Sequence, residues 1–146
     1  MALSLAAANG TVLKPGEIFS FNETTGDTTT GALGYLPATG ISNNKSVQVY
    51  GGGICQSSTT IYGAALRADM EIVTRYNHRW PSSYVPIGQD ATVDYPSTDF
   101  QFKNSSDYPV YIKAYMDGRT LVVQIYGHPS DEWDTIAVSY THLRAH

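Results

Sequence analysis

The sequence predicts a single α+β domain, with a curved, mostly antiparallel sheet and one main helix that begins at Cys55. Three observations lead to this prediction. The run Gly51-Gly52-Gly53 separates a strand pattern from a stretch of helix formers. Asp117-Gly118 lies between two alternating runs, 110–116 and 119–126, which is the strongest short-range signal of a β-hairpin. With 146 residues, the chain has the length of one domain with its own hydrophobic core.

The first part of the chain alternates short regular elements with turns. An apolar start that closes at Asn9-Gly10 is typical of a helix and its C-cap. Phe19 and Phe21 are two residues apart, so they share one face of an extended strand. We expect these elements in order: a helix over 1–9, strands over 11–13 and 18–21, an exposed loop over 22–31, an irregular segment over 35–44, and a strand over 45–50.

The second part begins with the main helix, which should end near Asp69. A long segment without periodicity, 82–90, follows later, and such segments in compact domains are often functional. The remaining expected elements are strands over 72–76, 91–95 and 99–103, a turn over 104–109, and the C-terminal hairpin.

The domain is expected to cover residues 1–127 and to lack part of its own N-terminus, because the apolar start is interpreted as the end of a helix and not as a leader. Residues 128–146 are interpreted as a tail. The last nine, Val138 to His146, resemble a translated sequencing adapter and are left out of the predicted fold and of every site.

Composition excludes several function classes. A net charge of -4 argues against nucleic acid as a partner. No apolar run approaches the length of a membrane span, so any membrane contact would come through segments missing from this chain. A single cysteine cannot form an internal disulfide. Scattered histidines with one cysteine show no ligand spacing, and neither a metal nor another cofactor is predicted.

Cys55 is the first candidate for chemistry. It is expected on the first turn of the main helix, where free backbone amides and the helix dipole favour negative charge. A thiol in that position can have its pKa lowered from about 8.5 into a range of roughly 3.5 to 7.5, which makes it a nucleophile. The alternative is a small buried hydrophobic residue after an ordinary glycine turn. Both interpretations stay open at this point.

A thiolate needs a base and a group that orients the base. His78, after a strand, is the candidate base, with a hydrogen-bonded structural histidine as the alternative. Asp90 is the candidate orienting group, with Asn77 and Asp94 as substitutes, although an Asp there is also typical of a turn or cap. Cysteine, histidine and aspartate in this order suit a papain-like or transpeptidase-like arrangement.

Further residues are predicted to bind substrate. Gln56 and the backbone amide of Cys55 are candidates for stabilising an oxyanion. The hydroxyls that follow Cys55 either bind a polar substrate or cap the helix. The substrate-binding prediction comprises Gly53, Gln56, Ser58, Thr59 and Tyr84.

Three stretches of the chain resemble the VanW domain, a family named for a vancomycin-resistance accessory protein. They are GTVLKPGEIFSFNETTG, GGGICQSSTTIYGAALRADMEIVTRYNHRWPSSYVPIGQDATVDYPSTDFQFKN and DYPVYIKA, within residues 3–126. The family pattern falls on Gly51, Gly52, Gly53, Cys55, Gln56, Ser58, Thr59, Thr60, Tyr62, His78, Tyr84, Pro86, Gly88, Asp90 and Ala91. Ser57 and Gly63 depart from it, where relatives often have valine and asparagine.

The resemblance implies an exported bacterial protein at the outer face of the cell envelope, membrane-anchored in its full-length form. It also implies peptidoglycan or its peptide precursors as partners. Two functions stay open. One is a cysteine-dependent hydrolase or acyl transferase on peptidoglycan peptides, with Cys55 as nucleophile, His78 as base and Asp90 as orienting group. The other is a non-catalytic cell-wall binding or scaffold module linked to glycopeptide resistance.

Overall fold

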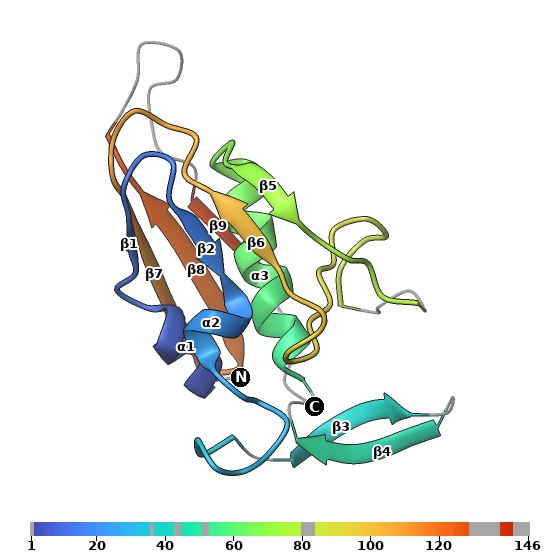
Figure 1. Cartoon of the computed structure of the whole chain (residues 1–146). Coiled ribbons are helices and arrows are strands. Elements are labelled where there is room, and N and C mark those ends of the chain that lie inside the picture. The colour runs from blue at the N-terminus through green and yellow to red at the C-terminus, as the bar shows by residue number, and fades with distance from the viewer. Residues whose placement is uncertain are drawn as a thin grey trace.

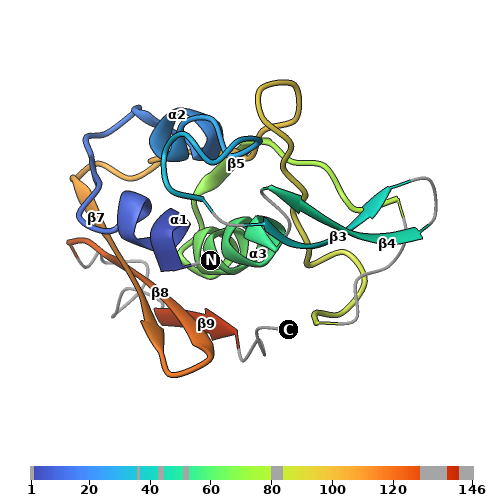
Figure 2. The ribbon, with the colours of Figure 1, turned by 90° about the horizontal axis from the view of Figure 1, so that it is seen from below.

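The helix α3, Ile54–Arg67, lies at the centre of the structure, with sheets on both sides of it (Figures 1 and 2). The structure is a computed structural model that describes residues 2–35, 37–42, 45–50, 53–79, 84–128 and 138–141. Side chains are described for these residues except 37–42, 45–50 and 138–141. None of the helices in these ranges is long and apolar enough to span a bilayer. The predicted α+β class is confirmed, although the strands form three antiparallel sheets instead of one.

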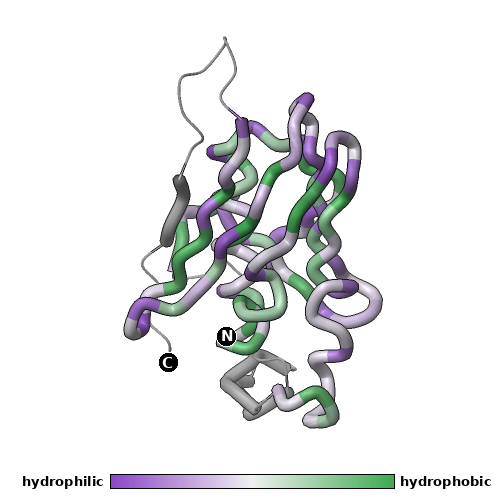
Figure 3. Tube along the Cα trace, turned by 90° about the vertical axis from the view of Figure 1, so that its left-hand side faces the viewer, coloured by the Kyte–Doolittle hydropathy of each residue, from purple (hydrophilic) through white to green (hydrophobic). Residues whose placement is uncertain are grey.

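The four-stranded sheet has the order β1-β7-β8-β9. Its strands are β1 Val12–Leu13, β7 Val110–Asp117, β8 Thr120–Tyr126 and β9 Val138–Thr141. Buried and exposed residues alternate along β7 and β8, as one-sided packing against α1 (Ala2–Ala8) and α3 requires (Figure 3). The predicted hairpin is confirmed, but Asp117 pairs with Thr120, so the loop residues are Gly118 and Arg119. Gly118 has a positive φ of 60°, which this tight turn requires.

β9 lies in a part of the chain that the sequence prediction left out of the fold. Val138–Thr141 pairs with β8 in antiparallel register, from Leu121 opposite Thr141 to Gln124 opposite Val138. The other edge of β8 is taken by β7, so β9 occupies the edge that the hairpin leaves open. Whether the tail belongs to the natural chain stays a prediction. Residues 142–146 lie outside the described residues.

The second sheet has the order β2-β6-β5 and supplies the aromatic part of the core. Its strands are β2 Ile18–Ser20, β5 Glu71–Thr74 and β6 Gln101–Lys103. Phe19 and Phe102 stack with ring centroids 5.2 Å apart, and Phe100 meets Tyr62 of α3 edge-on. These rings are buried. They pack on the side of α3 that faces away from the four-stranded sheet.

Two predicted irregular segments contain regular elements. The expected loop over 22–31 begins as the short helix α2, Phe21–Thr25, because Ser20 caps it by accepting from the Glu23 backbone amide. Phe21 is therefore helical and does not belong to an extended strand with Phe19 as predicted, although both rings are buried. The irregular segment over 35–44 contains β3, Pro37–Ser42, which forms a two-stranded sheet with the predicted strand β4, Lys45–Tyr50. In Figure 1 this hairpin projects from the rest of the chain.

The predicted strand over 91–95 was wrong. Within this stretch only Asp94 forms a bridge, to Thr98. The backbone groups of Ala91 and Val93 instead bond side chains at the start of α3. Because these groups are taken by the helix, the segment cannot join a sheet ladder, and it lies directly against the N-terminal half of α3.

Candidate functional site

Cys55 occupies the second position of α3, as the sequence predicted to within one residue. Gly53 is the N-cap residue and has a φ of 86°, a conformation that side chains disfavour. It thereby permits the sharp turn from which the helix starts. Gly51 and Gly52 lie outside the described residues. The Cys55 side chain is partly exposed and its sulfur is not in a disulfide, so it is neither sealed in the core nor fully open to solvent.

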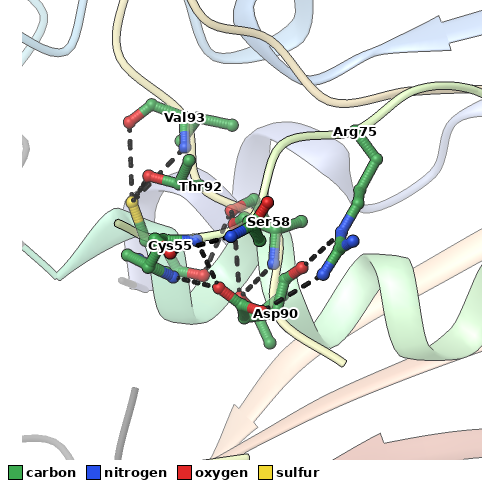
Figure 4. Close-up of polar contacts among 10 residues, drawn as sticks. Cys55, Ser58, Arg75, Asp90, Thr92 and Val93 are labelled. Atoms are coloured by element: carbon green, nitrogen blue, oxygen red, sulfur yellow. Dashed lines mark hydrogen bonds and ion pairs between the residues drawn. The ribbon is translucent and has the colours of Figure 1, made fainter. Parts of the chain in front are cut away.

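Polar groups surround the Cys55 sulfur. The Val93 backbone amide donates to Sγ at 3.4 Å, and the Thr92 hydroxyl lies 3.5 Å from Sγ (Figure 4). The thiol form can donate to the Val93 carbonyl, also at 3.5 Å. The His78 side chain also acts on the sulfur, since its interaction with Cys55 lowers the pKa of the thiol and raises that of the imidazole. Three of the four groups are able to donate a hydrogen bond to a thiolate, which is the environment of a reactive sulfur.

His78 is held by Asp90. The ring nitrogen Nδ1 of His78 lies 2.5 Å from Oδ2 of Asp90, and the His78 backbone amide donates to the same oxygen at 2.6 Å. Since Nδ1 faces Asp90, Nε2 is the nitrogen left for the sulfur of Cys55. Tyr84 packs its ring edge-on against the imidazole, with centroids 6.2 Å apart. The structure thus brings Cys55, His78 and Asp90 together in one chain of contacts. Of the two substitute candidates for the orienting group, Asp94 is exposed, and the Asn77 side chain donates to the His78 backbone carbonyl.

Arg75 is a site residue that sequence reasoning missed. Its Nε donates to the Asp90 backbone carbonyl at 2.8 Å, and Nη2 lies 3.2 Å from Oδ1 of the Asp90 carboxylate (Figure 4). The guanidinium also lies over the ring of Tyr62, 5.1 Å from its centroid. Arg75 therefore ties Asp90 to α3, with one Asp90 oxygen facing the arginine and the other facing His78.

The ionisation of the three residues follows from these contacts. Burial raises the pKa of the Cys55 thiol, but hydrogen bonds from His78, Val93 and Thr92 outweigh it and place this pKa below its ordinary value. The hydrogen bond to Cys55 raises the pKa of His78 against the opposing effect of burial, with Asp90 adding to the rise. Burial also opposes ionisation of Asp90, but the bonds from His78 lower the pKa of this carboxyl. All three shifts favour a thiolate–imidazolium pair beside a carboxylate.

The hydroxyls after Cys55 are engaged within the protein. Ser58 donates to the Ala91 carbonyl at 2.6 Å, and Thr59 both donates to that carbonyl and accepts from the Ala91 amide at 3.0 Å. Both residues are fully buried. In the structure the Ser58 and Thr59 hydroxyls hold the segment that carries Asp90, Thr92 and Val93 against α3. Their predicted role in binding substrate stays untested.

Gln56 is different. Its backbone amide donates to the Gly53 carbonyl at 3.1 Å, but the side-chain oxygen Oε1 is buried and has no hydrogen-bond partner in the part of the chain that the structure describes. A buried polar atom without a partner is uncommon. The predicted roles of Gln56 in stabilising an oxyanion and in binding substrate stay untested. Within the described ranges, no group of three or more histidine, cysteine or carboxylate residues is arranged to hold a metal ion.

Comparisons with known proteins place the chain in a family. The family model described as VanW like protein matches residues 1–126. The chain is similar to "Uncharacterized protein YoaR" of Bacillus subtilis, with 39% identity over 126 residues that cover 86% of this chain and 41% of that protein. It is also similar to "Vancomycin B-type resistance protein VanW" of Enterococcus faecalis, with 27% identity over 135 residues that cover 86% of this chain and 47% of that protein.

The chain thus spans less than half the length of these two curated relatives. No solved structure matches it significantly. Because the family model covers most of the chain, including every candidate site residue, the chain belongs to the VanW family.

Proposed function

We propose that this domain is a cysteine-dependent hydrolase or acyl transferase that acts on peptidoglycan peptides at the outer face of the bacterial cell envelope. The observation that carries the proposal is the chain of contacts from the Cys55 sulfur through the His78 ring to the Asp90 carboxylate. The name of the E. faecalis relative supports the link to the cell wall, since vancomycin resistance concerns cell-wall synthesis. Export and anchoring of the full-length protein belong to this proposal.

The geometry supports a two-step acyl transfer. The Cys55 thiolate attacks the carbonyl carbon of a substrate amide, and the π-electron pair moves onto the oxygen. When this intermediate collapses, the C–N bond breaks and the protonated His78 gives its proton to the leaving nitrogen. A thioester and a neutral imidazole remain. His78 then takes a proton from water or from an amine, which attacks the thioester and releases the thiolate. Asp90 orients the imidazole throughout and stabilises its charged form.

The reactivity of Cys55 toward iodoacetamide as a function of pH tests the first requirement. We expect alkylation to titrate below the ordinary thiol pKa, because His78, Val93 and Thr92 stabilise the thiolate. A His78→Gln variant should shift this titration upward. A thiol that titrates at its ordinary value in both proteins, or that resists labelling when folded, would contradict the catalytic proposal.

A second candidate is the non-catalytic wall-binding module, favoured by a cluster of exposed tyrosines on the outer face of the four-stranded sheet. Tyr111 and Tyr126 pair across β7 and β8 with ring centroids 6.4 Å apart, and Tyr115 lies further along β7. Aromatic faces of this kind suit glycan or peptide surfaces. Sedimentation with purified sacculi separates the two functions. Equal binding by the wild type and Cys55→Ala, with no products released by either, favours the module.

A further inference from the structure

Arg75 contacts Asp90 at two separate points. Its Nε donates to the Asp90 backbone carbonyl at 2.8 Å, and its Nη2 lies 3.2 Å from Oδ1 of the carboxylate. A planar guanidinium presents its donors in a fixed geometry that an ammonium group cannot reproduce. Because one rigid group holds both the main chain and the side chain of Asp90, rotation of the carboxylate about the Cα–Cβ bond is restricted.

The other oxygen of this carboxylate is committed to His78. Oδ2 accepts from the His78 backbone amide at 2.6 Å and lies 2.5 Å from Nδ1 of the ring. The two oxygens of Asp90 therefore have different partners, and a rotation of the carboxylate would break contacts on both sides. The Asp90 side chain is only 8% exposed, so water has little access to replace a lost partner. The position of Oδ2, and with it the ring nitrogen left for the sulfur, thus depends on the contact at Oδ1.

Arg75 is itself held from the side of α3. The guanidinium lies over the buried ring of Tyr62, 5.1 Å from its centroid, and Tyr62 belongs to the same helix as Cys55. Stacking on an aromatic face suits arginine better than lysine. The Tyr76 carbonyl, next in the chain, accepts from the Thr92 amide at 2.8 Å, and the Thr92 hydroxyl lies 3.5 Å from Sγ. The segment after β5 is thus connected both to the helix that carries the sulfur and to the segment that contacts it.

We propose that Arg75 is a positioning residue for the acyl transfer, because it fixes the Asp90 carboxylate and thereby keeps the His78 imidazole in one orientation through both steps. The inference deepens the proposed function and rests on it for the reaction. The imidazole loses its proton in the first step and takes one up in the second. Its attraction to Asp90 weakens while the ring is neutral, whereas the charge of Arg75 is permanent. Since Oδ1 stays held in both states, the ring does not have to be reoriented between them.

The groups around this chain of contacts decide which variant tests it. Losing the geometry of Arg75 frees the carboxylate to leave the imidazole, which then stabilises the thiolate less. Losing the positive charge acts in the opposite direction, since a nearby cation disfavours the imidazolium. A lysine keeps the charge and so isolates the geometry. Among the described residues, the other charged and titratable side chains in contact with these groups or lining the adjoining pocket are Tyr62, Arg79 and Tyr84.

The first test compares Arg75→Lys with the wild type in the pH dependence of Cys55 alkylation by iodoacetamide. Lysine cannot hold the carbonyl and the carboxylate at once, so we expect the profile to move up by about one pH unit, toward that of an ordinary thiol. Arg67→Lys is the matched control. Arg67 also donates to a backbone carbonyl, that of Gly63, but it lies at the other end of α3, and its replacement should leave the profile in place.

NMR of the His78 ring gives a second readout that does not depend on a variant. In the wild type the Nδ1 proton should resonate downfield and exchange slowly with water, as a hydrogen bond to a buried carboxylate requires. In Arg75→Lys this proton should exchange several-fold faster, whereas Arg67→Lys should match the wild type. A general loss of stability would lower the thermal midpoint of the variant without this selective change at one ring proton.

The outcomes separate this inference from the proposed function. A lowered wild-type alkylation profile that Arg75→Lys leaves unchanged, or that Arg67→Lys moves as much, removes the role of Arg75 and leaves the enzyme. A freely exchanging Nδ1 proton in the wild type overturns the inference without any variant. A wild-type thiol that titrates as an ordinary thiol counts against catalysis, and the Nδ1 proton then still decides whether Arg75 holds the carboxylate against the ring.

Discussion

The two halves of α3 differ in chemistry although most residues of each are buried. The N-terminal half, Ile54–Thr60, carries buried polar side chains, while the C-terminal half, Ile61–Arg67, presents alanines and large apolar residues to the core. Burying a polar group costs free energy unless it is hydrogen-bonded. Ser58 and Thr59 meet that requirement through Ala91. The polar half thus positions the segment around Ala91. The apolar half anchors the helix in the core.

The comparison shows which half should respond to which kind of substitution. Changes in the polar half are expected to affect chemistry and the placement of segment 84–93. Changes in the apolar half are expected to affect the free energy of unfolding and to leave the chemistry of folded molecules intact. Substitutions matched across the two halves separate these effects.

The largest expected effect is on activity, from Cys55→Ser. Replacing the sulfur by a hydroxyl removes the thiolate, because a serine hydroxyl is not ionised near neutral pH. Release of products from purified peptidoglycan, measured by mass spectrometry, should fall by more than about 10³-fold. The thermal midpoint should change little, since the substitution is nearly isosteric at a partly exposed position. Activity retained at a tenth of wild type or more would rule out Cys55 as the nucleophile.

Asp90→Asn should lower activity by about 10²- to 10⁴-fold, because an amide does not fix the imidazole tautomer or stabilise its positive charge. Its lowered pKa means that Asp90 stabilises the fold above the ordinary aspartate pKa and loses that effect as pH falls through the lowered value. The variant should therefore lose less stability than the wild type on acidification. Asp94→Asn, at an exposed position nearby in sequence, is the control for both readouts. Equal loss in the two variants would contradict the role of Asp90.

Much of the fold could be predicted because its signals are local. The β7–β8 hairpin has alternating faces and a glycine turn, and the start of α3 follows from glycines and then helix formers. The helix α2 was missed although Ser20 and Glu23 have the spacing of a capping box. The strand expected over 91–95 failed for a non-local reason. Its backbone is bonded by Cys55 and Thr59, more than 30 residues earlier in the chain.

The residues of the candidate site also divide into those with a local sequence signal and those whose contacts are non-local. Cys55 could be singled out because its glycine and helix context is contiguous in sequence, His78 because it follows a predicted strand, and Asp90 because it lies in the segment without periodicity. Arg75 could not, since its role depends on a fold that brings β5 against the loop at Asp90. Ser58 and Thr59 were expected to bind substrate or to cap. In the structure their hydroxyls bond Ala91, a contact that no local pattern encodes.

Ile61→Ala tests the apolar half. Ile61 is completely buried in α3, and its truncation leaves a cavity that should lower the free energy of unfolding by about 2 to 5 kcal/mol. Leu66→Ala on the same helix, where the side chain is partly exposed to solvent at 43%, should cost less than about 1 kcal/mol. Denaturant unfolding measures both. The rate of Cys55 alkylation in folded Ile61→Ala should match the wild type, and a slowed rate would mean that the two halves are not separable.

The smallest expected effect is that of Thr59→Val, which sharpens the comparison within the polar half. The substitution keeps the shape of the side chain but leaves the buried Ala91 amide without its acceptor, while Ser58 still serves the Ala91 carbonyl. Leaving one buried donor without an acceptor should lower the free energy of unfolding by about 1 to 3 kcal/mol. The matched control is Thr60→Val, because Thr60 donates only to the Gln56 carbonyl one turn earlier in the helix. Hydrogen exchange should become faster at Ala91 in the first variant and stay unchanged there in the second. If the two variants behave alike, the bonds to Ala91 do not position the loop, and the polar half of α3 would need another explanation.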